Sequence, residues 1–386
     1  MGALSSITVL ELGDGVDVEF AGKLLADLGA QVLKVESPSG AASRHQPPFF
    51  QDDSDTDCSI HFWHYNTSKR SVICDLSTDE GIHRLRELHA SADAVIDAMV
   101  TPLAALLGPM NDGGAPLKSR TVYCRITPFG ATGPWAGYQS SDLVQLALGG
   151  IMASCGYDDP DSAPVAPSGG QSGHMTGVNV AIGVLAGLLS RSRSGVSPAF
   201  DIAAHDCVTL ATEMAFTYWE YQRTTPWRQT GRHARPYPTS PWNHLCRDGR
   251  YVSTLPLYLT DNRFAAMVEW FDEFGLAGPL RDPRYTTRES RTEHLDEIIP
   301  VIRDFCAQHD SDYIFHEAQR RRLPWAPVNF TWDLVDDPHF VDREAFVPVA
   351  HPRHARTITY PGAPYKLSRT PWAVRGCAPA RSSDEV

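Results

Sequence analysis

The residues of this sequence that could carry chemistry include a histidine, His174, in the segment GHMTG (residues 173–177). A histidine titrates close to neutral pH, so His174 could act as a base or polarise a carbonyl group. Alternatively, it is a loop histidine that caps the following helix or contacts solvent. His205 and Asp206 are a second candidate acid–base pair, although the same two residues also suit the start of a helix.

The eight cysteines lie far apart in the sequence, with no C-x-x-C pair and no tight group of Cys and His. In a chain of 386 residues this pattern is typical of buried free thiols in a reducing cytoplasm. The sequence therefore predicts a cytoplasmic protein without a metal site.

The first half of the chain is predicted to form alternating strands and helices, which would position these side chains. Residues 7–12 and 31–36 are short apolar runs that predict buried strands, and residues 20–30 between them have apolar side chains at helical spacing. A strand, a helix and a strand within thirty residues predict a βαβ unit and a parallel sheet. Further strands are expected at 70–76, 93–99 and 121–130, with helices at 78–90 and about 175–191.

The second half indicates a separate, smaller module. Residues 224–241 are rich in Arg, Pro and Thr, which predicts a linker, and a strand at 248–257 is followed by helical patterns. We expect an N-terminal part of a large domain at 1–225, a small domain with its linkers at 226–320 and a return to the large domain at 321–375. The tail, residues 376–386, looks disordered from residue 378 onwards.

Composition limits the class of partner. Hydrophobic residues make up 42% and charged residues 21% of the chain, which is typical of a soluble globular protein. The formal net charge of −12 argues against a nucleic-acid or anionic-membrane binder, which would need a basic surface. The apolar run at 178–189 is too short to span a bilayer and carries Asn179, so we expect no membrane segment there.

Five segments in order resemble the class III CoA-transferases, the family of formyl-CoA transferase, carnitine CoA-transferase and α-methylacyl-CoA racemase. They are LLADLGAQVLKVESPSGAASR (residues 24–44), NTSKRSVICDL (66–76), ITPFGATGPWAGYQSSDLVQLALGG (126–150), TGVNVAIGVLAGLLSRSRSG (176–195) and the pair DPRYTTRESRTEHLDEI and LPWAPVNFTWDLVDDPHF (282–298 and 323–340).

This resemblance implies an α/β fold with a Rossmann-like large domain built from both chain ends and a smaller α+β domain. It also implies an interlocked, ring-shaped dimer and an acyl-CoA substrate. In the transferases of this family an aspartate attacks the thioester, because covalent catalysis divides one difficult exchange between two acids into easier steps.

The place of that aspartate, in D-x-x-[ST]-G, is occupied here by Gly173, while Thr176 and Gly177 match. The racemase members use the same aspartate and a histidine whose place here is Ser141, so both of their bases are absent. Asp142 matches a family aspartate and is a candidate catalytic residue, although a helix N-cap explains it as well.

The basic residues that could bind the phosphates of CoA match the family pattern more closely than the catalytic positions do. Arg44 and Lys69 match positions that meet the cofactor in the family, and Arg70 and Val16 are further candidate contacts. The alternative for Arg44 and Lys69 is a surface ion pair. Asp17 and Glu19 replace an Ala-Gly-Pro turn that approaches CoA in the family, and we expect them to place negative charge near the ligand.

Three functions stay open. The chain is an enzyme acting on an acyl-CoA or related activated acid by an atypical mechanism, with His174 as the base and backbone amides as oxyanion donors. Alternatively, it is a subunit without its own nucleophile that pairs with an active paralogue in a heterodimer, rather than forming a homodimer. Thirdly, it is a non-catalytic acyl-CoA-binding homologue.

Overall fold

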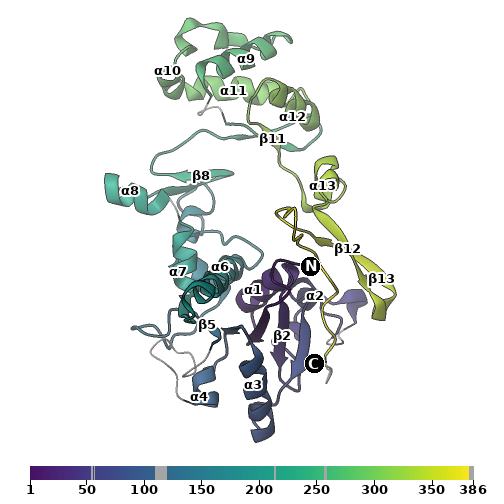
Figure 1. Ribbon diagram of the computed structural model, residues 1–386. Coiled ribbons are helices and arrows are strands. Elements are labelled where there is room, and N and C mark those ends of the chain that lie inside the picture. The colour runs from purple at the N-terminus through teal and green to yellow at the C-terminus, as the bar shows by residue number, and fades with distance from the viewer. Residues whose placement is uncertain (54, 56, 109–119, 213, 256–258, 382–386) are drawn as a thin grey trace. The chain divides into compact units, whose positions relative to one another are not determined.

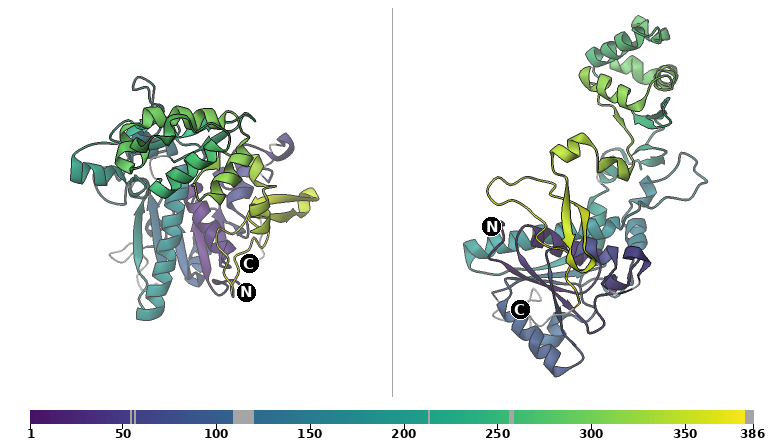
Figure 2. Two further views of the ribbon diagram at one scale, coloured as in Figure 1. Left: turned by 90° about the horizontal axis from the view of Figure 1, so that it is seen from above. Right: turned by 90° about the vertical axis from the view of Figure 1, so that its right-hand side faces the viewer.

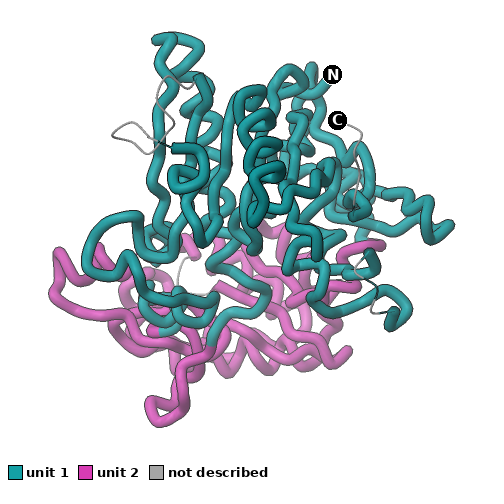
Figure 3. The backbone as a smooth tube through the Cα atoms, turned by 90° about the horizontal axis from the view of Figure 1, so that it is seen from below, with its two compact units in different colours: residues 1–152, 166–213, 337–386 teal, residues 153–165, 214–336 magenta. Residues whose placement is uncertain are grey.

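The structure is a computed structural model that describes residues 1–53, 55, 57–108, 120–212, 214–255 and 259–381. Its contacts divide the chain into two compact units, coloured separately in Figure 3. Unit 1 comprises residues 1–152, 166–213 and 337–386, and unit 2 comprises residues 153–165 and 214–336. Unit 1 thus contains both ends of the chain, while the domain boundaries given above stay a prediction.

The core of unit 1 is a parallel sheet of six strands in the order β3-β2-β1-β4-β5-β6, visible beneath its helices in Figure 1. This order reverses between β1 and β4, as in Rossmann-like folds, and confirms the predicted fold class. The strands are β1 (Thr8–Leu12), β2 (Gln31–Glu36), β3 (Arg70–Ile73), β4 (Ala94–Asp97), β5 (Val122–Thr127) and β6 (Ala199–Ala203).

Both faces of the sheet are covered, which is why its strands read as apolar runs rather than as alternating patterns. On one face, Val9 and Val32 pack against Leu25 of α1 (Val16–Asp27) and Val184 of α6 (Gln171–Ser194). On the other face, Leu10 and Leu33 pack with Leu85 of α3 (Asp79–Ser91).

Helix α6 is longer than the sequence pattern predicted, because it begins at Gln171 and runs for 24 residues. By length and composition alone this helix of 24 residues is long and apolar enough to cross a membrane, although the apolar run at 178–189 by itself is shorter. A core helix of a soluble protein meets the same test, and the buried residues of α6, including Val180 and Val184, pack on the sheet.

Short helices and a hairpin complete unit 1. The helices are α2 (Ile60–Tyr65), α4 (Leu103–Leu107), α5 (Asp142–Leu148), α7 (Ala204–Leu210) and α13 (Pro338–Asp342), and the antiparallel hairpin is β12 (Phe346–His351) with β13 (Arg356–Pro361). The hairpin, yellow in both views of Figure 2, packs against α2, since Val349 and Tyr360 share a core with Phe62 and Trp63.

The described part of the tail is ordered, contrary to the prediction of disorder from residue 378. The backbone oxygen of Pro379 accepts a hydrogen bond of 3.1 Å from Arg44, and the backbone nitrogen of Arg381 donates one of 3.0 Å to Asp57. Residues 382–386 lie outside the described residues.

Unit 2 has its own hydrophobic core, which contains Trp270, Phe271 and Trp325. Its helices are α8 (Met214–Gln222), α9 (Asp261–Asp272), α10 (Arg288–Glu293), α11 (Leu295–Cys306) and α12 (Ser311–Arg320). Its strands are β7 (Trp227–Gln229), β8 (Arg232–Arg235), β9 (Asn243–Leu245), β10 (Tyr251–Ser253) and β11 (Ala326–Pro327). The segment predicted to be a linker, residues 224–241, therefore contains the hairpin of β7 and β8.

Candidate active site

The first turn of α6 carries both Gly173 and His174, so neither residue lies in the loop that the sequence pattern indicated. The turn is held by Asp142, whose Oδ1 accepts hydrogen bonds from the backbone nitrogen of Ser172 at 2.9 Å and from its hydroxyl at 2.7 Å. A carboxylate at this place satisfies free amides and interacts favourably with the positive end of the helix dipole. Asp142 therefore caps α6 from 30 positions earlier in the chain.

Ser141 and Asp142 have separate roles. The Ser141 side chain accepts a hydrogen bond from the backbone nitrogen of Val144 at 3.3 Å and so caps α5, whereas Asp142 caps α6. The N-cap interpretation of Asp142 thus applies to the neighbouring long helix, and its predicted catalytic role stays a prediction.

Gly173 is packed against the start of α1. A Cβ atom built on Gly173 would lie 2.7 Å from Cβ and 2.8 Å from Cγ1 of Val16. One turn later, a Cβ on Gly177 would lie 2.9 Å from the backbone oxygen of Asp17. Side chains at these two places would need α1 and α6 to move apart, so a carboxylate at position 173 does not fit this backbone. Val16, a predicted CoA contact, occupies that space.

The His174 imidazole has a defined orientation. Its Nδ1 lies 3.0 Å from the backbone oxygen of Gly170, and its Nε2 lies 3.1 Å from the hydroxyl of Tyr65. Because a carbonyl oxygen can only accept, Nδ1 carries a proton, and in the neutral ring Nε2 accepts the hydrogen bond that Tyr65 donates. The edge-on ring of Phe20, with centroids 4.8 Å apart, packs against the same imidazole.

Tyr65 belongs to α2, and its ring centroid lies 5.6 Å from that of His174. Burial, followed by the charge of Glu19, raises the pKa of Tyr65, so the phenol stays protonated. The rings of His61 and His64 lie 5.0 and 4.7 Å from the Tyr65 ring. Burial, then Lys23 and His174, lowers the pKa of His64 to about 4, so His64 is neutral near pH 7. Neither these histidines nor Tyr65 was found from the sequence.

His205 and Asp206 do not form the predicted pair in the described contacts. The His205 ring lies 5.5 Å from Phe129 and 5.9 Å from Trp135, whereas Asp206 lies in the first turn of α7. The interpretation as a helix start fits this arrangement.

Arg44 is fully buried rather than part of a surface ion pair. Its Nε and Nη2 donate to the two carboxylate oxygens of Glu36 at 2.7 and 2.8 Å, and its Nη1 donates to Asp57 at 2.8 Å. Its guanidinium also lies over the ring of Phe62. Burial alone would raise the pKa of Glu36, but the hydrogen bonds and charge of Arg44 outweigh it and lower that pKa.

Lys69 is buried as well. Its Nζ lies 2.8 Å from a carboxylate oxygen of Glu11 and donates to the backbone oxygen of Glu19 and to Oδ1 of Asn66, each at 2.8 Å. Arg70, by contrast, begins the edge strand β3 and is exposed. The predicted contacts of Arg44, Lys69 and Arg70 with CoA phosphates therefore stay a prediction.

Glu19 does not place a free negative charge near a ligand, contrary to expectation. It is fully buried, with Oε1 2.9 Å from Lys34 Nζ, and Lys34 also lies 3.1 Å from Glu11. Burial would raise the pKa of Glu19, but Lys34 and Lys69 outweigh it and lower that pKa. Paired strands explain this cluster, because Glu11 and Lys34 are register partners of β1 and β2.

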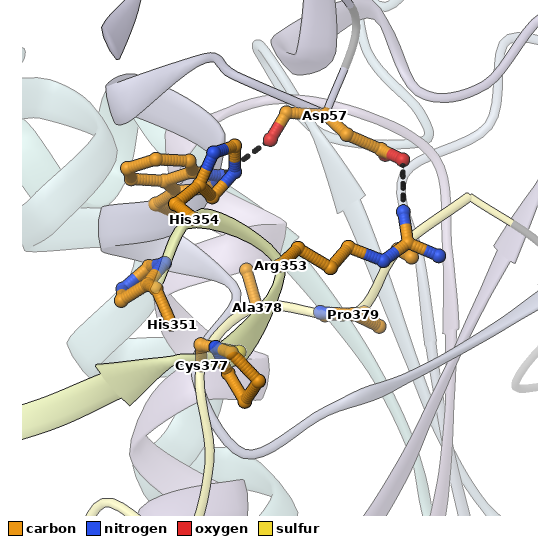
Figure 4. Close-up of a pocket in the computed structure, with 10 residues that line it drawn as sticks. Asp57, His351, Arg353, His354, Cys377, Ala378 and Pro379 are labelled. Atoms are coloured by element: carbon orange, nitrogen blue, oxygen red, sulfur yellow. Dashed lines mark hydrogen bonds and ion pairs between the residues drawn. The ribbon is translucent and has the colours of Figure 1, made fainter. Parts of the chain in front are cut away.

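A cavity of about 240 Å³ lies beside Asp57, lined by His351, Arg353, His354 and residues 377–380 (Figure 4). Arg353 closes one side through an ion pair of 2.7 Å with Asp57. Among the described residues, no group of three or more His, Cys, Asp or Glu side chains is arranged to hold a metal ion.

This Rossmann-like sheet, with α1 and α6 packed on one of its faces, belongs to a known class. The sequence model of CoA-transferase family III matches residues 4–385, and the chain is a member of this family. It is 31% identical to succinyl-CoA:mesaconate CoA-transferase of Haloarcula hispanica, over 98% of this chain and 93% of that protein. It is 28% identical to the succinyl-CoA:(R)-benzylsuccinate CoA-transferase subunit BbsE of Thauera aromatica, over 93% of this chain and 87% of that protein.

Among solved structures, a CAIB/BAIF family protein from Brucella suis superposes with a TM-score of 0.81. The two chains are 24% identical, and the match covers 98% of this chain and 96% of the other. At this identity the likeness is one of fold.

Proposed function

We propose that this protein acts on an acyl-CoA thioester and transfers CoA to a second carboxylic acid, with an active site at the first turn of α6 that contains no carboxylate at position 173. One observation carries the proposal. Tyr65 and His174 form an oriented hydrogen-bonded pair next to Gly173, where packing leaves no room for a side chain. The relatives whose names specify succinyl-CoA as the donor support this class of substrate.

The Tyr65–His174 pair can contribute in two ways. When His174 carries a proton on both ring nitrogens, its Nε2 donates to the Tyr65 oxygen, and the hydroxyl proton of Tyr65 is then free to donate a hydrogen bond to the thioester oxygen as negative charge develops there. The imidazole can also hold or move a proton at Nε2, because its Nδ1 is already fixed on Gly170. CoA itself, when bound, supplies the thiol that is exchanged between the two acids.

The test is CoA exchange by the purified chain. We expect succinyl-CoA and an added organic acid to give the new CoA thioester and free succinate, followed by mass spectrometry. His174→Ala should abolish most of this exchange, whereas His83→Ala, an exposed histidine of α3, serves as the matched control and should not. Exchange at unchanged rates in His174→Ala would remove the pair from the reaction.

A second candidate is a subunit without its own nucleophile, which forms a heterodimer with a catalytic paralogue rather than a homodimer. Two observations favour this candidate. The name of the Thauera aromatica relative specifies a subunit, and packing at Gly173 leaves no room for a side chain. This candidate predicts that the chain alone binds succinyl-CoA without turnover and that adding a paralogue with D-x-x-[ST]-G restores exchange. Binding without turnover under both conditions would instead indicate a non-catalytic homologue.

A further inference from the structure

The cavity beside Asp57 is enclosed by three segments of unit 1 that lie far apart in the sequence. Trp63 of α2 lies on one side, the turn that joins β12 to β13 supplies two histidines and an arginine, and the tail completes the lining (Figure 4). The volume of about 240 Å³ is below the roughly 300–1,000 Å³ of pockets that hold drug-sized ligands. The cavity therefore suits a ligand of one ring with a short polar group.

The wall around Trp63 is aromatic. The centroid of the Trp63 ring lies 4.4 Å from that of His351 and 5.0 Å from that of His354. The indole position is fixed, because its Nε1 donates a hydrogen bond of 2.8 Å to the backbone oxygen of Asp57. A planar ring can join such a cluster through offset or edge-to-face contacts. This wall therefore favours an aromatic ligand over an aliphatic chain.

The acidic groups of the lining are already occupied or protonated. Oδ1 of Asp57 accepts hydrogen bonds from Arg44 and from the backbone nitrogen of Arg381, and its Oδ2 accepts one from Arg353. Burial raises the pKa of the Cys377 thiol, which is therefore protonated near pH 7. Among the described residues that line the cavity, no negative group is left over for a cationic ligand.

Two donors, in contrast, remain for an anion. Arg353 uses only Nη1 on Asp57, and its other N–H groups have no partner among the described contacts. His351 is buried, and its Nε2 lies 2.9 Å from the hydroxyl of Tyr360. That hydroxyl is buried and has no other acceptor in the described part of the chain, so it donates to Nε2.

The proton of the His351 ring therefore lies on the other nitrogen, Nδ1. Burial, followed by the charge of His354, lowers the pKa of His351, and the imidazole is neutral near pH 7. A neutral ring that accepts at Nε2 carries its single proton on Nδ1. This N–H has no partner among the described contacts, although His351 is only 2% exposed. A buried donor of this kind gains from an acceptor atom on a ligand.

We propose that this cavity binds a small aromatic carboxylate, with its ring against Trp63 and its carboxylate on Arg353 and on Nδ1 of His351. Two N–H groups of a guanidinium match the two oxygens of a carboxylate, which gives the ligand a fixed orientation. The cavity and the proposed active site use different residues of α2. Trp63 packs with the hairpin, whereas Tyr65 contacts His174. Binding here does not depend on the proposed CoA exchange.

The test is a titration of the purified full chain with benzoate, measured by isothermal titration calorimetry. We expect a single saturable site and a melting temperature that rises with the benzoate concentration. Two probes of similar size separate the two parts of the ligand. Benzamide keeps the ring without the charge, and cyclohexanecarboxylate keeps the charge without the planar ring. Each should bind more weakly than benzoate.

Variants locate the bound benzoate. Arg353→Gln should weaken binding by at least about tenfold, because it removes the charged donor. Ala378→Phe, which fills the cavity from the tail, should abolish binding. Arg356→Gln changes an exposed arginine of the same hairpin that does not line the cavity, and this matched control should bind as the unchanged protein does. Melting curves without benzoate verify that each variant is folded.

Benzoate is itself a carboxylic acid, so binding at the proposed active site must be distinguished. His174→Ala should leave benzoate binding unchanged. If His174→Ala weakens binding while Arg353→Gln does not, the ligand lies at the active site and the assignment to the cavity is overturned. Binding that neither Arg353→Gln nor Ala378→Phe affects, or no saturable binding at millimolar benzoate, overturns it as well. CoA exchange is measured separately, and its failure would leave the cavity proposal untouched.

Discussion

Val16 and Gly173 touch at the crossing of α1 and α6, where a Cβ on the glycine would lie 2.7 Å from Cβ of the valine. Helices approach this closely only where a side chain is missing from one of them. The absence of a side chain at Gly173 is therefore a packing requirement of this helix crossing.

Gly173→Ala tests this packing directly. The added Cβ meets the branch point of Val16, which is not a flexible chain end, so we expect a loss of about 1–3 kcal/mol in the free energy of unfolding. Chemical denaturation measures it. Gly183→Ala on the same helix is the control, because its Cβ would meet only the end of Ile202 at 3.4 Å, and we expect no loss there.

Gly173→Asp should not create a better enzyme. The carboxylate would have to push α1 and α6 apart, so we expect lower stability and no gain in CoA exchange. Combining Gly173→Asp with Val16→Gly should recover part of the lost stability, because it removes the atoms that clash. A Gly173→Asp protein that is as stable as the parent and faster in exchange would contradict this packing argument.

Tyr65→Phe separates the hydroxyl from the ring. The variant keeps the contact with His174 but removes the hydrogen bond to Nε2, so we expect kcat to fall by about 10- to 10²-fold with little change in KM. His174→Ala should lower kcat by roughly 10²- to 10⁴-fold. Steady-state kinetics measures both, and a rise in KM without a fall in kcat would indicate a role in binding alone.

The ion pair of Glu36 and Arg44 predicts a dependence of stability on pH. The pKa of Glu36 is lower in the folded protein than its ordinary value of 4.5, so the unfolded chain binds the proton more tightly. Its contribution is full above that ordinary value and is lost as the pH falls through the folded pKa.

Glu36→Gln should therefore destabilise the protein by roughly 3 kcal/mol near pH 7, because it leaves Arg44 buried without its partner charge. The difference from the unchanged protein should shrink as the pH falls below about 4.5. Glu87→Gln, an exposed residue of α3, is the control. A difference that stays constant from neutral to acid pH would contradict the lowered pKa.

Asp142→Ala removes the cap of α6, and we expect a loss of about 1 kcal/mol in stability. Asp142→Asn keeps an oxygen that can accept from Ser172 and should cost less. Because this turn carries His174, Asp142→Ala should also lower exchange more than Asp142→Asn does. Equal effects of the two substitutions would show that the charge, and not the hydrogen bond, holds the turn.

The sheet could be predicted from the sequence because each strand is a local apolar run, as in residues 31–36, and the order of segments identified the family. The site could be predicted only in part. The start of α6 depends on Asp142, 30 positions away, and no local pattern reveals such a cap. Tyr65 lies on a helix of six residues that is too short to show a period. The burial of Arg44 depends on partners at Glu36, Asp57 and Pro379, which local spacing does not bring together.

The contact between Arg44 and Pro379 spans 335 positions of the chain. During synthesis, all six strands of the parallel sheet have been made when residue 203 emerges, yet the guanidinium of Arg44, in the turn that follows β2, still lacks one of its acceptors. That acceptor is made only when residue 379 has been added. Arg44 therefore reaches its final set of hydrogen bonds only after residue 379 has been made, and a partner fused downstream should be attached beyond Arg381.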